Sequence, residues 1–215
     1  MAKPRLLLAD DHTLVVEAFT RLLEDEFEIV KVVSDGISLL REAPALKPDV
    51  VILDLGMPLL NGMDAGKELK RILPSTKIVV LTMSEDFELA AEALRHWASG
   101  YLLKKSAARE LVKAIHEALA HRTYITPRIA QRVLDEFVRD PNPDHRKHPT
   151  KQQRRVLQLL AEGKSMKEAA ATLNISARTV AFHKYQLMAE QGLRNQSDIV
   201  MFAIKERVLA PPPPR

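Results

Sequence analysis

The stretch Val50-Val51-Ile52-Leu53-Asp54-Leu55-Gly56-Met57-Pro58 decides the fold of this chain. Its four consecutive apolar residues are mostly β-branched, a pattern typical of a strand that is buried on both faces of a sheet. Gly56 and Pro58 interrupt the pattern, so Asp54 is predicted to lie where the strand opens into a loop. In open parallel sheets that edge binds ligands. An Asp there can cap the strand, bind a metal or act as a nucleophile.

The surrounding sequence, residues 1–122, alternates strand and helix patterns. The expected strands are Leu6–Ala9, Ile29–Val33, Val50–Leu53, Ile78–Leu81 and Tyr101–Leu103. The expected helices are 13–24, Ile37–Glu42, Met63–Leu73, Phe87–Trp97 and 107–120, the first with an apolar stripe of Leu14, Ala18 and Leu22. Five such units predict an α/β doubly wound, five-stranded parallel sheet with helices on both faces and the flavodoxin-like strand order 2-1-3-4-5.

The predicted strand order brings several polar residues to one edge of the sheet. Strands 1 and 3 are neighbours at the point where the order reverses, and they end at Asp10-Asp11 and at Asp54. Each Asp alone could be a strand cap. The carboxylates of Asp10, Asp11 and Asp54 would repel one another at this edge, and a partly hydrated Mg²⁺ ion would relieve that repulsion.

Two further residues follow strands 4 and 5 at the same edge, Thr82 and Lys104. A hydroxyl and an ammonium group beside a metal and a carboxylate form a site for a phosphoryl group, whose oxygens the cations neutralise. Asp54 is then the predicted nucleophile, which forms an acyl phosphate.

Composition places limits on the class of protein. The chain has 215 residues, 46% of them hydrophobic, and no cysteine, so disulfide and thiolate chemistry are excluded. No apolar run reaches the roughly 18 residues of a membrane helix, and a cytoplasmic location is expected. Residues 1–138 carry 18 Lys+Arg and 21 Asp+Glu, whereas residues 139–215 carry 14 and 7. The basic second part is either a solvated surface or a nucleic-acid-binding domain.

Residues 3–121 resemble the receiver domain of two-component response regulators, in the Asp10-Asp11 pair, Asp54 in D-L-G-M-P, Thr82, and Lys104 in G-Y-L-L-K. The resemblance implies that Asp54 is the phosphoacceptor, with Thr82 and Lys104 as catalytic partners. It implies a Mg²⁺ site of Asp10, Asp11, Asp54 and the backbone carbonyl of Gly56, and a switch pair of Thr82 and Tyr101. Met83 and Lys105-Ser106 depart from the family pattern, which prefers a small residue and a proline there.

Residues 123–149 are predicted to form a linker helix followed by a Pro-rich linker. Thr126 is a good N-cap and Pro127 fits the first helical position. Ile129, Val133 and Phe137 form an apolar stripe that could pack on either domain. His145 and His148 are expected to be solvated rather than metal ligands.

Residues 150–208 are predicted to form an all-α, four-helix helix-turn-helix domain, before a Pro-rich tail at 209–215. Thr150 and Ser165 each begin a capping box, Gly163 and Asn174 end helices, and Ser176 caps the third helix. In that third helix Val180 and Leu187 should face inward, with His183 near the boundary. The outward residues, possible DNA contacts, are Arg178, Ala181, Phe182, Lys184 and Tyr185. Packing of the two aromatics against the first domain is the alternative.

The second domain resembles the LuxR-type effector domain in L-L-A-E-G-K-S-x-K-E-A-A and in T-V-x-x-H, so the whole chain resembles a NarL/FixJ-type response regulator. Gln153 and Arg155 replace acidic residues of that family, and Ala181 replaces a frequent Lys. The resemblance implies a transcriptional regulator, not an enzyme. It would be phosphorylated by a sensor histidine kinase, bind double-stranded DNA and form homodimers that phosphorylation promotes.

Two other functions are compatible with the same sheet edge. A Mg²⁺-dependent phosphohydrolase commonly carries a second Asp two residues after the nucleophile, where this chain has Gly56. A phosphorylation-independent binding protein with a vestigial receiver would not need the intact acidic site.

Overall fold

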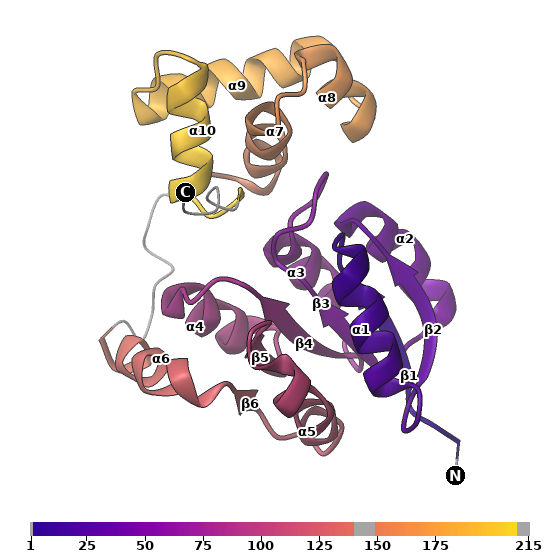
Figure 1. The fold of residues 1–215 in the computed structure, drawn as a ribbon. Helices are drawn as coiled ribbons and strands as arrows, with labels where there is room; N and C mark the ends of the chain where they lie inside the picture. Colours follow the sequence, from indigo (N-terminus) through magenta and orange to yellow (C-terminus); the bar gives the residue numbers. More distant parts are fainter. Residues whose placement is uncertain (1, 140–148, 210–215) are drawn as a thin grey trace. The chain divides into compact units, whose positions relative to one another are not determined.

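The computed structural model describes residues 2–139 and 149–209, which form two compact units (Figure 1). The predicted linker residues His145 and His148 and the Pro-rich tail from residue 210 onward lie outside the described residues. The strands of the first unit are β1 (Arg5–Ala9), β2 (Glu28–Val33), β3 (Val50–Leu53), β4 (Lys77–Thr82), β5 (Gly100–Leu103) and β6 (Tyr124–Ile125). Its helices are α1 (Thr13–Leu23), α2 (Gly36–Leu46), α3 (Gly62–Ile72), α4 (Phe87–His96), α5 (Ala107–Leu119) and α6 (Pro127–Arg139).

The sheet has the strand order β2-β1-β3-β4-β5-β6 with every pair parallel, which confirms the predicted order of the first five strands. The register places Ala9 opposite Leu53 and Thr82 opposite Leu103. Neighbouring strands therefore end at the same level, and the polar residues that follow them meet at one edge.

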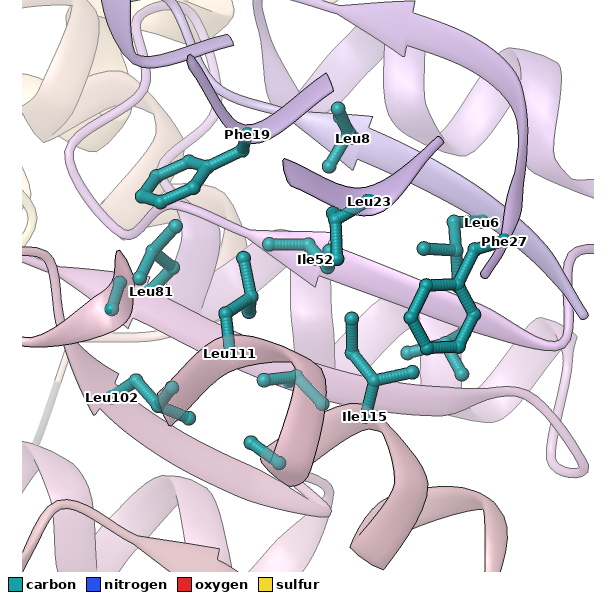
Figure 2. Packing of buried hydrophobic residues seen from close by; sticks show 14 of the residues in the cluster. Leu6, Leu8, Phe19, Leu23, Phe27, Ile52, Leu81, Leu102, Leu111 and Ile115 are labelled. Carbon is teal, nitrogen blue, oxygen red and sulfur yellow. The ribbon is translucent and has the colours of Figure 1, made fainter. Parts of the chain in front are cut away.

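The core of the sheet lies where the sequence placed it. All four residues of β3 are buried, with at most 3% of any side chain exposed, because helices cover both faces (Figure 1). One face is covered by α1 and α5, whose apolar side chains pack on β1, β3, β4 and β5 (Figure 2). This rigid double-sided packing fixes the positions of the strand ends.

Of the apolar stripe Leu14, Ala18 and Leu22 in α1, only Leu22 packs against the core. Leu14 is 81% exposed and Ala18 is also exposed, whereas Phe19 and Leu23 are buried in the core. Both stripes have a four-residue spacing, so the pattern alone cannot distinguish them. The larger Phe19 faces the sheet and decides the rotation of the helix.

Two predicted boundaries also differ from the structure. Helix α2 does not end at Glu42 but continues through Pro44, because Leu39 and Ala43 are buried on its inner face and Lys47 closes the helix in the left-handed conformation. Residues 124 and 125 are not helical but form β6, beside β5. Helix α6 then begins at Pro127, as predicted.

Helix α6 packs on α4 of the first unit. Its apolar stripe, which could have packed on either domain, is therefore buried against the first. Ile129 and Val133 are 2% and 0% exposed. The guanidinium of Arg132 lies 4.3 Å from the ring centre of Phe87, and that of Arg95 lies 4.6 Å from the ring centre of Phe137. The two cation–π contacts hold the helices together in addition to the apolar contacts.

The second unit consists of α7 (Lys151–Ala161), α8 (Met166–Leu173), α9 (Ala177–Gln191) and α10 (Gln196–Lys205). Both predicted capping boxes are present, at Thr150 with Gln153 and at Ser165 with Glu168. Asn174 ends α8 in the left-handed conformation, and Ser176 caps α9. Val180 and Leu187 are buried in the core of this unit, as expected.

Candidate functional site

Three carboxylates come together at the carboxyl edge of the sheet. The backbone N–H of Asp54 donates to the carbonyl of Ala9 at 2.8 Å, and that of Asp10 donates to Val33 at 3.0 Å, so the sheet ladder itself fixes both residues. Asp10 and Asp54 are buried, at 8% and 4% exposure, whereas Asp11 is exposed. The arrangement concentrates negative charge where β1 and β3 end.

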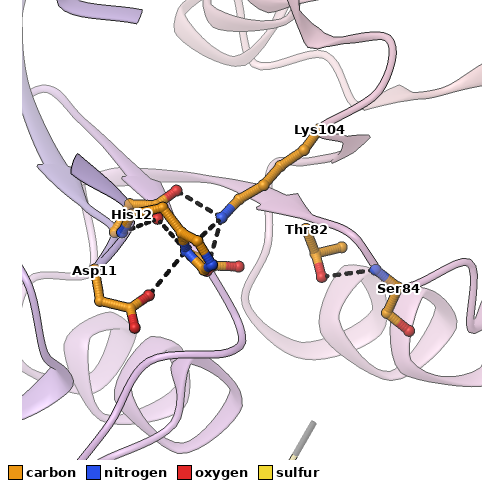
Figure 3. A network of polar contacts seen from close by, with 7 residues as sticks. Asp11, His12, Thr82, Ser84 and Lys104 are labelled. Atoms are coloured by element: carbon orange, nitrogen blue, oxygen red, sulfur yellow. Dashed lines mark hydrogen bonds and ion pairs between the residues drawn. The ribbon is translucent and has the colours of Figure 1, made fainter. Parts of the chain in front are cut away.

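Lys104 brings a positive charge into the same cluster from β5. Its buried Nζ atom lies 2.8 Å from an Oδ2 atom of Asp54 and 2.8 Å from one of Asp10 (Figure 3). Burial raises the pKa of Asp54 above its usual value, and Lys104 opposes this shift without cancelling it. The carboxylates therefore still lack positive charge, which a bound cation would supply.

His12 joins the cluster, a contact that the sequence analysis did not predict. Its Nδ1 atom lies 3.0 Å from an Oδ1 atom of Asp10 and of Asp11, and 3.8 Å from Asp54 (Figure 3). One ligand atom from each of these four residues lies within 4.8 Å of the others. Three carboxylates in this space provide the oxygen ligands that Mg²⁺ prefers.

Thr82 and Tyr101, the predicted switch pair, are both buried, at 4% and 0% exposure. The Thr82 hydroxyl accepts a hydrogen bond from the backbone N–H of Ser84 at 3.1 Å, in the loop that leads to α4 (Figure 3). The neighbouring Met83 side chain is 58% exposed and points away from the core. Thr82 thus lies at the shared strand edge and is tied to the start of α4.

Two glycines shape the loop that follows Asp54. The backbone N–H of Gly56 hydrogen-bonds to the Asp54 carboxylate and favours its charged form. A side chain at Gly62 would place its Cβ atom 2.1 Å from the carbonyl oxygen of Asp54. That contact is impossible, so this position requires glycine. Sequence reasoning missed Gly62, because a close backbone approach leaves no local pattern.

The outer face of α9, defined as Arg178, Ala181, Phe182, His183, Lys184 and Tyr185, is the second candidate site. Phe182 and Tyr185 are 63% and 59% exposed, and Arg178 is exposed, whereas Ala181 and Lys184, which were also expected to face outward, are half-buried. His183 is half-buried, near the boundary as expected, and its Nδ1 atom has no hydrogen-bond partner in the part of the chain that the structure describes. The Lys184 ammonium lies 5.7 Å from the ring centre of Tyr185. Cations beside exposed aromatics form a surface suited to nucleic acid.

On α7, Gln153 replaces an acidic residue of the LuxR-type pattern. Its side-chain amide donates to the carboxylate of Glu190 at the end of α9, at 3.2 Å. A hydrogen bond between an amide and a carboxylate thus joins α7 to α9 in this chain.

A flavodoxin-like sheet with this cluster at its edge, followed by a helix-turn-helix domain, defines a response regulator with a DNA-binding output domain. The chain belongs to the NarL/FixJ type of these regulators, because residues 6–116 match the response regulator receiver domain family and residues 150–203 match the LuxR family of bacterial regulatory proteins. It is accordingly a two-component transcriptional regulator.

Two known proteins, NreC and RcsB, are similar to this chain over nearly its whole length. The oxygen regulatory protein NreC of Staphylococcus aureus (strain USA300) is 32% identical over 214 residues, which cover 95% of this chain and 99% of NreC. The RcsB response regulator of Salmonella typhimurium has a TM-score of 0.64 at 27% identity, covering 96% of this chain and 99% of RcsB. A LuxR-family regulator from Aurantimonas sp. SI85-9A1 has a TM-score of 0.60 at 33% identity, covering 64% of this chain and 99% of that one.

None of the helices in residues 2–139 and 149–209 combines the length and the apolar character needed to cross a bilayer.

Proposed function

We propose that this regulator is controlled by phosphorylation of Asp54, with a sensor histidine kinase as the donor. The observation that carries the proposal is the position of Lys104, whose ammonium lies 2.8 Å from both Asp54 and Asp10 although it comes from a distant strand. An ammonium group and a nucleophilic carboxylate held in contact are the two parts that phosphoryl transfer to Asp requires.

In the proposed reaction, a carboxylate oxygen of Asp54 attacks the phosphorus of a phosphohistidine on the kinase. A P–O bond forms, the P–N bond breaks, and the electron pair remains with the imidazole of the kinase. Lys104 and the hydroxyl of Thr82 would contact the oxygens of the transferred group and stabilise their charge.

Magnesium is the proposed cofactor, held by carboxylates of Asp10, Asp11 and Asp54 and by the backbone carbonyl of Gly56. Support comes from the donor set, because the acidic ligand atoms lie within 4.8 Å of one another and Mg²⁺ prefers oxygen ligands. When bound, the ion would neutralise charge on the phosphoryl oxygens.

The proposed output is DNA binding through the outer face of α9. Thr82 and Tyr101 would change together on phosphorylation and promote homodimers, within a cytoplasmic protein. Solved RcsB complexes with DNA support this part, since RcsB is 28% identical to this chain in one of them. The proposed domains are a receiver at 1–122, a linker at 123–149, an effector at 150–208 and a tail at 209–215.

Intact mass spectrometry tests the proposal directly. The full chain, incubated with acetyl phosphate and Mg²⁺, should gain one phosphoryl group, and peptide mapping should place it on Asp54. Asp49→Asn is a matched control, because Asp49 lies at the opposite end of β3, where it accepts a hydrogen bond from the backbone of Arg5. Its phosphorylation should be normal. A wild-type chain that gains no mass, or gains it elsewhere, contradicts the assignment.

DNA binding is the second readout. Affinity for a promoter duplex should rise on phosphorylation in the wild type and not in Asp54→Asn. Equal affinity in all samples would favour a regulator that works without phosphorylation.

A further inference from the structure

Thr126, the residue before α6, forms hydrogen bonds through its hydroxyl inside the first unit. It is 2% exposed. Its hydroxyl donates to Oε2 of Glu110 on α5 at 2.9 Å and accepts from the backbone N–H of Leu103 at 3.2 Å. The hydroxyl of Ser106 lies 3.4 Å away. Ser106 donates its one hydroxyl proton to the carbonyl of Leu103 at 3.2 Å, so the Thr126 hydroxyl makes one donated and one accepted hydrogen bond. The predicted N-cap residue thus directs its side chain to β5 and α5.

These bonds hold the end of β5, which carries Lys104. The backbone N–H of Thr126 donates to the carbonyl of Tyr101 at 3.0 Å, and the hydroxyl binds Leu103, the residue directly before Lys104. On the opposite side of β5, the backbone N–H of Lys104 donates to the carbonyl of Thr82 at 2.8 Å. Thr126 therefore holds the Leu102–Leu103 peptide, and β4 holds the Leu103–Lys104 peptide that follows it, so the end of β5 is fixed from both sides.

Thr126 is also the point where the chain enters α6. Helix α6 contacts α4 through the Arg132–Phe87 and Arg95–Phe137 pairs, and α4 begins after the Thr82–Ser84 loop. The phosphoryl site thus reaches α6 along two routes, through β5 and Thr126 and through the Thr82 loop and α4.

We propose that Thr126 is a positioning residue of the phosphoryl site, which holds the end of β5 at Leu103, directly before Lys104, and transmits the displacement of that strand end to α6. The inference rests on the proposed role of Asp54 and deepens it. A phosphoryl group on Asp54 separates the carboxylate from the Lys104 ammonium, which then follows the new oxygens. The strand end that carries Lys104 is hydrogen-bonded to the residue that starts α6, so the displacement reaches the segment that leads along the chain to the effector domain.

If Thr126 had a purely structural role, its loss would loosen α6 without slowing phosphorylation. Two variants distinguish this role from the proposed one. Thr126→Val keeps the shape of the side chain and removes its hydrogen bonds, whereas Thr126→Ser keeps the hydroxyl. Thr76→Val is the matched control. Thr76 is also buried, and its hydroxyl donates to the carbonyl of Pro48 at 2.9 Å, before β4 at the opposite edge of the sheet.

The experiment compares two quantities in the full chain, the hydrogen exchange of residues 127–139 and the rate of phosphorylation by acetyl phosphate with Mg²⁺. In Thr126→Val the exchange of α6 should rise and the rate should fall, roughly twofold to thirtyfold. Thr126→Ser should keep both near wild type. Thr76→Val should leave the exchange of α6 and the phosphorylation rate unchanged.

The proposal is overturned if Thr126→Val has wild-type exchange in α6, or if it loosens α6 without slowing phosphorylation. If Thr126→Val fails to fold, Lys104→Met tests the coupling instead, because it leaves Thr126 intact. The proposal then predicts altered hydrogen exchange in residues 127–139. Wild-type exchange there would refute the coupling. A wild-type chain that takes up no phosphoryl group would instead contradict the role of Asp54. The exchange measurements would still accept or reject the anchoring of α6.

Discussion

The phosphoryl site and the outer face of α9 are assembled in opposite ways. Asp10, Asp54 and Lys104 come from the ends of three strands and lie together only because the sheet order places those ends side by side. Arg178, Lys184 and Tyr185 lie on one helix, Ala177–Gln191, so the helix alone sets the spacing between them. A site built from distant strands should act as a unit, whereas residues spaced along one helix should act separately.

The largest expected effect is the loss of phosphorylation when one residue of the phosphoryl site is removed. Asp54→Asn removes the nucleophile, and Asp11→Ala removes a carboxylate that would hold Mg²⁺, so each should abolish the mass gain with acetyl phosphate. The double variant should be no worse than either single one, because residues that act as a unit are not additive. Intact mass at equal times measures all three, and a substantial yield in either single variant would show that the cluster does not act together.

The second effect belongs to the outer face of α9 and should be additive. Arg178→Ala and Lys184→Ala should each weaken binding to every duplex and lower the slope of log affinity against log salt by about 0.9 per lost phosphate contact. The double variant should lose roughly twice that slope, because the two positions are six residues apart. Titrations at several salt concentrations on specific and random duplexes provide the test. Unchanged slopes would mean that α9 does not meet the DNA backbone.

Tyr185→Ala tests whether α9 also contacts the bases of the DNA and so contributes to sequence preference. If the exposed ring contacts a base, its removal should cost ~1–3 kcal/mol on the specific duplex and relax preference at one base pair. The random duplex serves as the control, since a lost base contact should matter little there. An equal loss on both duplexes would assign Tyr185 to the sugar-phosphate backbone.

The contrast also explains which features could be predicted from the sequence. The strand ends with Asp10, Asp54, Thr82 and Lys104 were predictable, because the buried strand runs fix both the topology and the edge where they meet. The helix boundaries of the effector domain were predictable too, since capping boxes and the left-handed Asn174 are local signals.

Features that depend on tertiary contacts were not predictable. Strand β6 has only two residues and no alternating pattern, so nothing in the sequence distinguishes it from the start of a helix. Thr126 acquires its partners on β5 and α5 only after β6 is placed on the sheet. The rotation of α1 also depends on the sheet, which buries Phe19 and leaves Leu14 exposed.

A smaller effect tests the local character of the effector domain. Ser165→Ala removes the side-chain bond to the backbone N–H of Glu168, and the loss of an N-cap costs roughly 1 kcal/mol. Trp97, the single tryptophan, lies in the first unit and reports unfolding of that unit alone. In urea unfolding followed by circular dichroism, the effector domain should therefore unfold at a lower urea concentration, whereas the transition in Trp97 fluorescence should stay unchanged. A shift of the Trp97 transition would mean that the two units do not unfold separately.

The smallest effect concerns the charge of Asp54 in the absence of divalent ions. Burial holds the pKa of Asp54 above its ordinary value of 3.8, so the folded state binds more protons than the unfolded state between these two values. The contribution of Asp54 to stability therefore decreases as the pH rises through that window, and remains unfavourable above it. Asp54→Asn, which cannot ionise, should accordingly be more stable than wild type near neutral pH, and this gain should shrink as the pH falls toward 3.8.

Urea unfolding followed by Trp97 fluorescence measures that gain, and comparing the two proteins at each pH cancels the titration of the other carboxyl groups. Added Mg²⁺ should reduce the gain, because the ion binds the carboxylates of the folded wild type and stabilises it by mass action. A gain that is the same at every pH would mean that Lys104 fully compensates the buried charge. The cluster would then have no unmet negative charge to attract a cation, and the argument that joins Asp10, Asp11 and Asp54 into one magnesium site would lose its electrostatic basis.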